Sequence, residues 1–294
     1  MKEFFKVNVK KYVADKDFEV CRPASLNKPK DHAVMFVTEG FMKYADALLS
    51  CKDCLVFWPE NIAVSDEVEQ RHAVCLCTNP HKEYCRFYSD NNITYYPENA
   101  EYECINGAYI AKGAKIGQNV TVFPGAYIGN EVEIGNDVYI GSGVRLVGAV
   151  SIGNHVVIRE NTVIGADGLS TDRNEKGEAL TMPQFGGVII EDNVQIGALT
   201  VIGRGAIDNT IIRKGAKIDN SCFISHNVDI GENTFVVGET IMFGSSSTGK
   251  QSFISGNATI RDGRHVGSNA KIGMGAVVTK NVEDGSVVKG NPAR

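Results

Sequence analysis

Aliphatic residues recur at every sixth position over most of the last two thirds of this 294-residue chain. The first run is unbroken, and its members are Ile110, Ile116, Val122, Ile128, Ile134, Ile140, Leu146, Ile152, Ile158 and Ile164. The pattern resumes at Ile190, Ile196 and Ile202, and again from Ile212 to Val278, where only Thr248 is not apolar. A period of six fits neither the 3.6-residue period of an α-helix nor the two-residue period of a flat strand.

A triangular coil explains this period. Each hexad supplies one short strand and one corner, the aliphatic side chain points inward, and the small residue after it turns the chain. Three hexads complete a coil, so residues 18 apart stack at roughly the 4.8 Å spacing of neighbouring strands. A β-sandwich does not account for so long a fixed phase. The pattern therefore predicts a mainly β fold, a parallel β-helix over residues 101–294, with each coil packed on the next.

Two interruptions break the hexads. The first runs from Asp167 to Gly186 and is polar, and the second inserts four residues between Ile202 and Ile212, around Arg204. Sites are commonly built from loops on a rigid scaffold. We therefore predict that these two loops, one or two coils apart, border the functional site.

The first hundred residues lack the hexad, and we predict that they form a separate small α/β domain over residues 1–100. Asn79 is a suitable cap for a helix that has Pro80 at its first position. Residues 91–105 are predicted to be a linker. The expected strands are His32–Val37, Cys54–Trp58 and Ala73–Cys77, and the expected helices are Phe41–Cys51 and Pro80–Asp90.

Composition excludes several classes of function. The net charge is −5, so the basic footprint of a nucleic-acid-binding protein is missing. We expect no membrane insertion, because no apolar run is long enough to span a bilayer and lysines interrupt the first residues. A cytoplasmic protein with free cysteines is predicted. Cys51-x-x-Cys54 and Cys75-x-Cys77 do not form a repeated zinc-site pattern, so no metal is expected.

Several segments resemble the UDP-3-O-acylglucosamine N-acyltransferase family of the lipid A pathway, one of the hexapeptide-repeat acyltransferase families. The resemblance rests on the segments 163–168, 183–186, 202–207 and 218–228, the last of which reads Ile-Asp-Asn-Ser-Cys-Phe-Ile-Ser-His-Asn-Val. Phe36-x-Thr38, Lys43-Tyr44 and Asn79-Pro80 are similar to the uridine-binding domain of that family. The resemblance implies a left-handed β-helix and an N-acyltransferase that acts on a UDP-linked amino sugar.

The chain departs from the family pattern in four places. Gly203-Arg204-Gly205 stands where the family has Asp-Arg-Gly, and Leu169 replaces an expected Phe. The second histidine of the family falls on Gly263, with His265 two residues out of register. The last residues, 287–294, are similar to the ends of coenzyme A-dependent acetyltransferases rather than to a helical tail that contacts a carrier protein. The acceptor class is therefore better supported than the donor.

Acyl transfer from a thioester to an amine needs a base and a donor of hydrogen bonds to the oxyanion. The resemblance makes His226 the general base. Asp219, one hexad earlier, is the expected orienting and charge-stabilising partner. Gly244 follows His226 by 18 residues, so it is expected one coil above it, where its backbone N–H faces the oxyanion.

The remaining expectations concern substrates and assembly. Gln184, Asn220 and Asn227 are predicted to contact the sugar or diphosphate, and Phe36 and Tyr44 to sandwich the uracil ring. The co-substrate is an acyl-carrier-protein phosphopantetheine thioester or a coenzyme A thioester, and no cofactor is held. The assembly is expected to be a homotrimer.

Three alternatives stay open at this stage. One is a coenzyme A-dependent N-acetyltransferase of another nucleotide-linked amino sugar. Another is a zinc carbonic anhydrase on the same scaffold, but His155, His226 and His265 occupy different hexad phases. A non-catalytic scaffold is the third. Gly244–Gln251 nearly matches a phosphate-binding loop, yet it stays in hexad register, so we predict a wall of the β-helix and no ATP.

Overall fold

The computed structural model describes residues 2–96 and 100–294, and the chain divides into two compact units. The N-terminal unit combines Met1–Tyr95 with Leu169–Phe185, and the β-helix unit combines Tyr96–Gly168 with Gly186–Arg294. The predicted division at residues 100 and 101 therefore needs a correction, because it assigned 169–185 to the β-helix. Pro97 and the two residues after it, within the predicted linker, lie outside the described residues.

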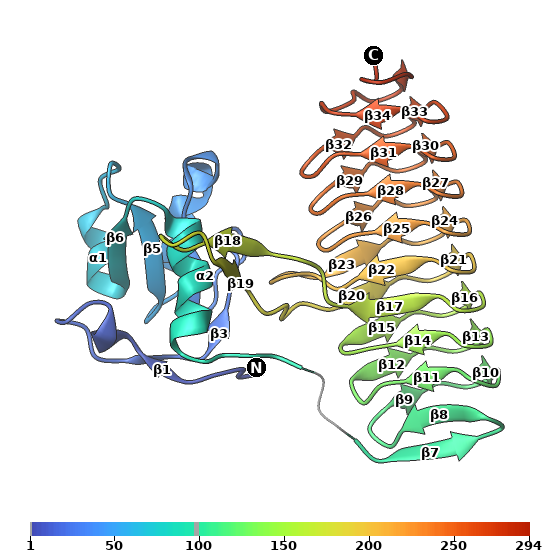
Figure 1. Ribbon diagram of the computed structural model, residues 1–294, viewed down its shortest axis with the longest axis horizontal. Helices are drawn as coiled ribbons and strands as arrows, with labels where there is room; N and C mark the ends of the chain where they lie inside the picture. The colour runs from blue at the N-terminus through green and yellow to red at the C-terminus, as the bar shows by residue number, and fades with distance from the viewer. Residues whose placement is uncertain (1, 97–99) are drawn as a thin grey trace. The chain divides into compact units, whose positions relative to one another are not determined.

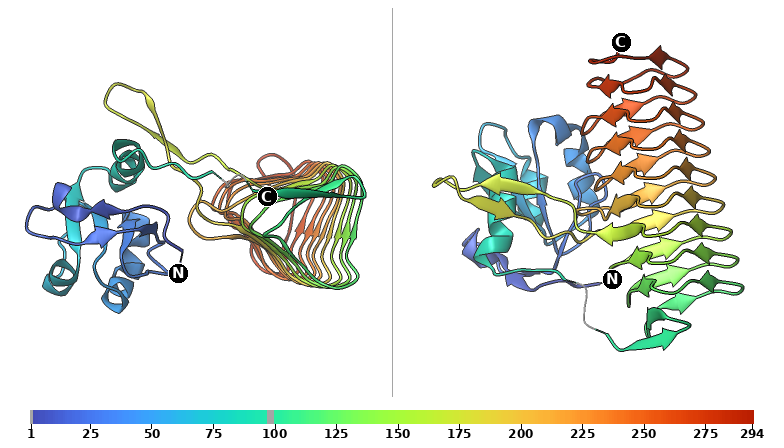
Figure 2. Two further views of the ribbon diagram at one scale, coloured as in Figure 1. Left: turned by 90° about the horizontal axis from the view of Figure 1, so that it is seen from below. Right: turned by 45° about the vertical axis from the view of Figure 1, so that its right-hand side comes forward.

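The β-helix unit is a left-handed parallel β-helix with three sheets, and each coil gives one strand to each sheet (Figures 1 and 2). Sheet 1 consists of β10 (Thr121–Val122), β13 (Tyr139–Ile140), β16 (Val157–Ile158), β21 (Gln195–Ile196), β24 (Lys217–Ile218), β27 (Phe235–Val236), β30 (Phe253–Ile254), β33 (Lys271–Ile272) and β35 (Val287–Val288). Sheet 2 consists of β7 (Tyr102–Ile105), β8 (Ala108–Ala111), β11 (Tyr127–Ile128), β14 (Arg145–Leu146), β17 (Val163–Ala166), β22 (Val201–Gly203), β25 (Phe223–Ile224), β28 (Ile241–Met242), β31 (Thr259–Ile260) and β34 (Val277–Val278). Sheet 3 consists of β9 (Lys115–Ile116), β12 (Val132–Ile134), β15 (Val150–Ile152), β20 (Val188–Ile190), β23 (Thr210–Ile212), β26 (Asp229–Ile230), β29 (Ser247–Thr248) and β32 (His265–Val266).

The register between coils follows the hexads. Ile128 pairs with Leu146, 18 residues later, and both side chains are fully buried in the core of the β-helix. Across the first interruption the pairing joins Ile164 to Ile202. The inserted residues therefore leave the wall without changing the stacking. Burying each such side chain contributes about 1.5–3 kcal/mol, so the core stabilises the coils one on another.

The corners use residues that tolerate a left-handed backbone, such as Asn119, Asp137 and Asn161, all with φ between 55° and 58°. Thr248, the one polar residue in the hexad run from Ile212 to Val278, is satisfied because its hydroxyl accepts a hydrogen bond from the Gly231 N–H at 2.9 Å. Thr248 lies in β29, which pairs with β32 in sheet 3. The segment that resembles a phosphate-binding loop is therefore part of the wall, as predicted.

The N-terminal unit contains a four-stranded parallel sheet in the order β3-β4-β5-β6. Its strands are β3 (Arg22–Pro23), β4 (Ala33–Phe36), β5 (Leu55–Pro59) and β6 (Ala73–Cys77), and its helices are η1 (Val9–Lys11), η2 (Glu39–Ser50), α1 (Asp66–Arg71) and α2 (Pro80–Asp90). A short antiparallel pair, β1 (Val7–Asn8) and β2 (Glu19–Val20), precedes the sheet.

The expected strands and α2 are confirmed, whereas three helices differ from expectation, among them the short η1, which was not predicted. The segment predicted as a helix over Phe41–Cys51 is a 3-10 helix, η2. Thr38 gives it no side-chain cap, and Gly40 in its first turn is a poor α-helix former. Helix α1 was not predicted, although Ser65 caps it through the Val68 N–H. No helix within residues 2–96 and 100–294 is long and apolar enough to cross a bilayer.

The first interruption forms a β-hairpin of β18 (Thr171–Arg173) and β19 (Ala179–Thr181) within the N-terminal unit. Glu175 at its tip accepts from Lys82 at 3.0 Å and from Arg86 on α2, and Asp172 bonds to His81 at 2.8 Å. The hydrogen bonds from Arg86 and Lys82 lower the pKa of Glu175 to about 2. Residues 169–185 are therefore part of the N-terminal unit and not a loop of the β-helix, and their place beside the functional site stays a prediction.

Candidate active site

His226 lies at the corner between sheets 2 and 3 of the β-helix. It follows β25, whose Ile224 points into the core and is fully buried, and it precedes β26. The left-handed φ of 59° at Asn227 turns the chain directly after it. The histidine itself is half-buried, so its ring is anchored on the wall and still reaches solvent.

Two glycines form a narrow slot for the imidazole of His226. A Cβ on Gly244 would lie 2.6 Å from both Cε1 and Nε2 of the ring. A Cβ on Gly168 would lie 2.9 Å from Cβ and Cδ2 of the same histidine. Real Cβ contacts are not this short, so any side chain at either position would displace the imidazole. The expected stacking of Gly244 above His226 is thus observed, with Ser245 N–H donating to the His226 carbonyl at 2.9 Å.

Asn227 fixes which ring nitrogen of His226 carries the proton. The amide nitrogen of Asn227 donates to the Asp208 carbonyl at 2.8 Å, and its Oδ1 accepts from the Ala206 N–H at 3.0 Å. A carbonyl oxygen can only accept and a backbone N–H can only donate, so these two partners allow only one orientation of the Asn227 amide. Its Oδ1 lies 3.1 Å from Nδ1 of His226, so Nδ1 donates and Nε2 keeps its lone pair. Nε2 is therefore the basic nitrogen, and it faces Gly244.

Asp219 and Asn220 are at a different corner, between sheets 1 and 2. Asp219 Oδ2 accepts from the Gly238 N–H at 3.2 Å, and its Oδ1 accepts from Asn220 Nδ2 at 2.8 Å. Asn220 Oδ1 accepts from the Ala198 N–H at 2.7 Å. One hexad moves the chain along one side of the triangle, so the spacing from Asp219 places His226 at the next corner. Asp219 is consequently not the partner of this imidazole, and both side chains tie coils together.

Arg204 in the second interruption connects the two ends of the first. Its side chain is 1% exposed, Nε donates to the Gly186 carbonyl at 2.8 Å, and Nη1 lies 3.9 Å from Asp167 Oδ1. Gly186 and Asp167 flank the segment that leaves the wall. Burial raises the pKa of Asp167, and the charge of Arg204 opposes this rise. Sequence reasoning gave Arg204 no role, although its position between two glycines was noted.

Phe36 and Tyr44 do not form the expected sandwich. Phe36 packs against His81 and Tyr84 of α2, with ring centroids 5.3 and 4.8 Å away. Its neighbours Met35 and Val37 point to the other face of the sheet, where Tyr44 packs with them. The two aromatic rings thus lie on opposite faces of the sheet. Gln184 is buried, and its amide donates to the Met182 carbonyl at 3.2 Å.

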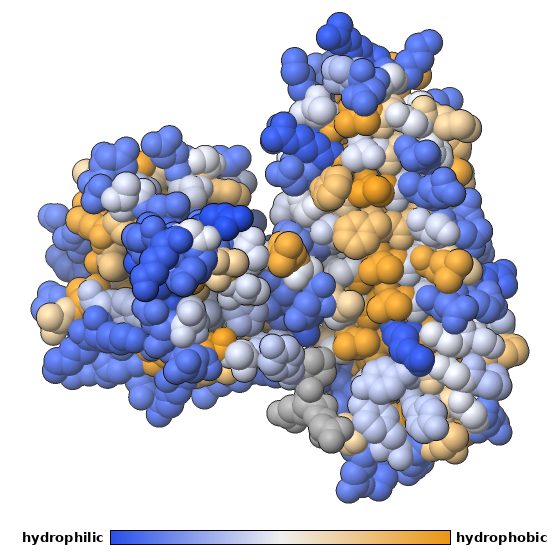
Figure 3. Space-filling model, viewed as in Figure 1, coloured by the Kyte–Doolittle hydropathy of each residue, from blue (hydrophilic) through white to orange (hydrophobic). Residues whose placement is uncertain are grey.

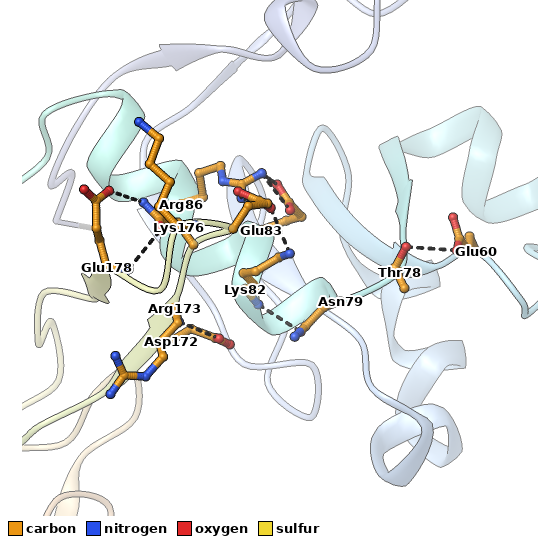
Figure 4. Close-up of polar contacts among 12 residues, drawn as sticks. Glu60, Thr78, Asn79, Lys82, Glu83, Arg86, Asp172, Arg173, Lys176 and Glu178 are labelled. Atoms are coloured by element: carbon orange, nitrogen blue, oxygen red, sulfur yellow. Dashed lines mark hydrogen bonds and ion pairs between the residues drawn. The ribbon is translucent and has the colours of Figure 1, made fainter.

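The N-terminal unit has a hollow of about 460 Å³ at the carboxyl ends of β4, β5 and β6. Thr38, Asn79 and Pro80 line it, and these are three of the residues in the uridine-domain motifs of the sequence. Asn79 caps α2 through the Lys82 N–H at 3.0 Å, and Thr78 donates to Glu60 at 2.9 Å (Figure 4). In open parallel sheets, ligands bind outside the carboxyl ends of the strands.

Cys85, His81 and Asp172 resemble a nucleophile, base and orienting carboxylate. Nδ1 of His81 lies 2.8 Å from Asp172 Oδ2, and its Nε2 lies 4.0 Å from the Cys85 sulfur. However, Cys85 is fully buried, and burial raises the pKa of its thiol to about 12. A thiol that is protonated and inaccessible does not attack a substrate.

The chain matches the family model described as bacterial transferase hexapeptide (six repeats) at residues 113–148 and 131–166. A UDP-3-O-acylglucosamine N-acyltransferase of Sulfurimonas denitrificans is 39% identical over 129 residues, 44% of this chain and 41% of the relative. One from Francisella tularensis subsp. holarctica is 56% identical over 79 residues, 27% of this chain and 23% of the relative. The matches thus span less than half the length of these curated relatives.

Among solved structures, UDP-N-acetylglucosamine acyltransferase from Campylobacter jejuni is similar with a TM-score of 0.58 and 24% identity, covering 65% of this chain and 73% of the other. The Arabidopsis UDP-N-acetylglucosamine acyltransferase gives 0.52 and 25%, covering 64% and 71%. These likenesses support the left-handed β-helix fold. These likenesses do not assign a role to His226 or to the residues around it.

Proposed function

We propose that this chain, a member of the hexapeptide-repeat acyltransferase family that includes the UDP-3-O-acylglucosamine N-acyltransferases, transfers an acyl group from a thioester to the amine of a UDP-linked amino sugar. The observation that carries the proposal is the slot between Gly168 and Gly244, in which Asn227 leaves Nε2 of His226 unprotonated. Such a nitrogen is poised as a general base. The names of the relatives supply the substrate class of the proposal.

In the proposed reaction, Nε2 of His226 takes a proton from the sugar amine as the nitrogen attacks the thioester carbonyl carbon. A C–N bond forms, and the carbonyl oxygen becomes an oxyanion. The coil-to-coil bonds use the N–H groups of Phe243 and Ser245, on either side of Gly244. The Gly244 N–H then donates to the oxyanion. Collapse of the intermediate breaks the C–S bond, and the thiolate takes the proton from the imidazolium, giving an amide and a thiol.

Asn227 replaces Asp219 in this proposal as the positioning residue. It accepts from Nδ1 of His226 and keeps the ring in one tautomer, without placing a negative charge beside it. Its amide also holds Ala206 and Asp208 of the second interruption, so the ring and that loop are positioned together. The earlier expectation that Asn227 contacts the sugar is not part of the proposal.

We further propose that the hollow at the carboxyl ends of β4, β5 and β6 binds the nucleoside. Glu39 and Glu60 line it, and carboxylates suit ribose hydroxyl groups, as they do in dinucleotide-binding folds. The same carboxylates disfavour a phosphate at this position. Isothermal titration with uridine and with inorganic phosphate separates these expectations, because only uridine should bind, and Asn79→Ala should weaken it.

We also propose a homotrimer. The outward residues of sheet 2 include Val163, Val201, Phe223 and Ile241, a row of apolar side chains visible on the face formed by β17, β22, β25 and β28 (Figure 3). Phe223 is 41% exposed and directly precedes the corner that holds His226. A row of this kind is typical of an interface. Light scattering tests the trimer, and a monomer would overturn it.

The donor is the main variable of the test. Purified protein is incubated with a UDP-linked 3-O-acylated glucosamine and, separately, with an acyl-carrier-protein thioester or an acyl-coenzyme A, and products are identified by mass spectrometry. Amide formation with either donor supports the proposal and identifies the donor. No amide with either donor, while UDP-sugar binding is intact, contradicts it. A cytoplasmic location stays a prediction.

A further inference from the structure

Two cysteines and a histidine from two segments of the N-terminal unit meet in its core. Cys51 directly follows η2, Cys54 directly precedes β5, and His72 directly precedes β6. Their ligand-type atoms, two sulfurs and a ring nitrogen, all lie within 4.8 Å of one another. The parallel pairing of Leu55 with Ala73 brings Cys54 beside His72, although 18 residues separate them in the chain. In the described residues, this is the one such group of histidine, cysteine and acidic side chains.

The two sulfurs have the spacing of ligands around a metal ion. Cys51 Sγ and Cys54 Sγ are 3.7 Å apart, whereas sulfurs in a disulfide are about 2.0 Å apart. With metal–sulfur bonds of about 2.3 Å, two ligands of a tetrahedral zinc ion are separated by about 3.8 Å. The observed separation of the two sulfurs is thus close to the one that a shared ion requires. The carbonyl oxygens of Lys30 and Lys52 lie 3.2 and 3.3 Å from Cys54 Sγ and accept hydrogen bonds from its protonated thiol.

His72 is held in the form that a metal ligand requires. It is fully buried, and its two ring nitrogens face partners of opposite kinds, a carbonyl oxygen and an N–H, which is the pattern of a neutral imidazole. Nε2 lies 3.0 Å from the Leu48 carbonyl oxygen, which only accepts, so Nε2 carries the hydrogen. The lone pair is therefore on Nδ1, which now receives only a long 3.3 Å bond from the Cys54 N–H. Metal-bound histidines usually donate their other N–H to a backbone carbonyl in this way.

Charge and access also fit a divalent cation. Cys51 is 4% exposed and Cys54 fully buried, so an uncompensated charge here is costly, whereas two thiolates and a divalent ion are neutral together. His72 borders a hollow of about 450 Å³ whose charged lining residues are Asp15, Asp66, Glu69 and Lys16. Three carboxylates against one ammonium group favour a cation in this hollow.

We propose that Cys51, Cys54 and His72 bind one thiophilic divalent cation of the zinc class. The ion ties the end of η2 to the starts of β5 and β6, so its role is structural. Each thiol loses its proton as its sulfur–metal bond forms, and binding releases up to two protons with no change in oxidation state. This inference does not depend on the acyl-transfer proposal, and it changes the sequence-based expectation that no metal is bound.

The test uses the reduced full-length chain, freed of metal with a chelator. Titration with Co²⁺ should give the visible absorption of a tetrahedral thiolate site, saturating at one ion per chain, and Zn²⁺ should abolish it. Binding should release protons and raise the melting temperature. Cys54→Ser should weaken Co²⁺ binding at least tenfold, while the control Cys77→Ser, from the other closely spaced pair, should bind like the wild type.

Several results would overturn the proposal. These are no cobalt absorption in the wild type, equal loss of binding in Cys77→Ser, or a Cys51–Cys54 disulfide forming on mild oxidation in a protein that binds no metal when reduced. If Cys54→Ser does not fold, the melting temperature of the wild-type protein serves as the test. The proposal then requires that chelation lowers this temperature and that Zn²⁺ restores it. Amino-sugar acylation is not among the readouts, so failure here leaves the proposed enzyme activity untouched.

Discussion

Replacing Gly244 by alanine tests the slot around His226 with a single methyl group. The new Cβ would lie 2.6 Å from Nε2 and Cε1 of the imidazole, so the ring must retreat by about 0.8 Å to reach an ordinary contact near 3.4 Å. A misplacement of about 1 Å at a reacting group costs about 10²-fold in rate, equivalent to about 2.7 kcal/mol of activation free energy. We therefore expect kcat to fall by about that factor.

The assay is the initial rate of amide formation by mass spectrometry, with kcat and KM determined for both substrates. The matched control is Gly256→Ala. Like Gly244, Gly256 is the second residue after the end of a strand and has an ordinary φ. A Cβ on Gly256 would lie no closer than 3.3 Å to any atom and would not meet an imidazole. The control should keep wild-type kcat, and both variants should keep the wild-type melting temperature. A Gly244→Ala enzyme with wild-type kcat would refute the reasoning.

Three further predictions concern other parts of the chain. Asn227→Asp places a carboxylate beside Nδ1 of His226, which favours the imidazolium, so the acidic limb of kcat/KM against pH should move to higher pH. Ile140→Ala removes a fully buried core side chain and should lower the free energy of unfolding by about 2–5 kcal/mol in urea titrations. Burial lowers the pKa of His72, so below the ordinary value of 6.5 the unfolded chain binds a proton that the folded chain does not. Without metal, the free energy of unfolding should therefore be level above pH 6.5 and fall as the pH decreases below it, and His72→Asn should remove this slope.

The β-helix was predictable because its six-residue period can be read directly from the positions of the aliphatic residues. Residues 18 apart stack, so the sequence places Gly244 directly above His226 without knowledge of the structure. The same rule explains why Asp219 was misassigned, since one hexad leads to the next corner of the triangle and not to a neighbour of the histidine.

The N-terminal unit was less predictable because its contacts depend on strand pairing. The hairpin at 171–181 is held to α2 by Glu175 and Asp172, and nothing in its local sequence indicates a partner 90 residues earlier. Likewise, the Cys51-x-x-Cys54 pattern lacks a further ligand until β5 and β6 pair and bring His72 to it. Phe36 and Tyr44 belong to two motifs of the same expected uridine site, yet alternation along β4 points Phe36 away from the face on which Tyr44 of η2 packs.

The most direct test of the central claim is the rate of amide formation by His226→Ala. The proposed general base contributes about 10²–10⁴-fold, so kcat should fall by that factor while KM for both substrates and the melting temperature stay unchanged. A folded His226→Ala protein that acylates the amino sugar at the wild-type rate would contradict the account.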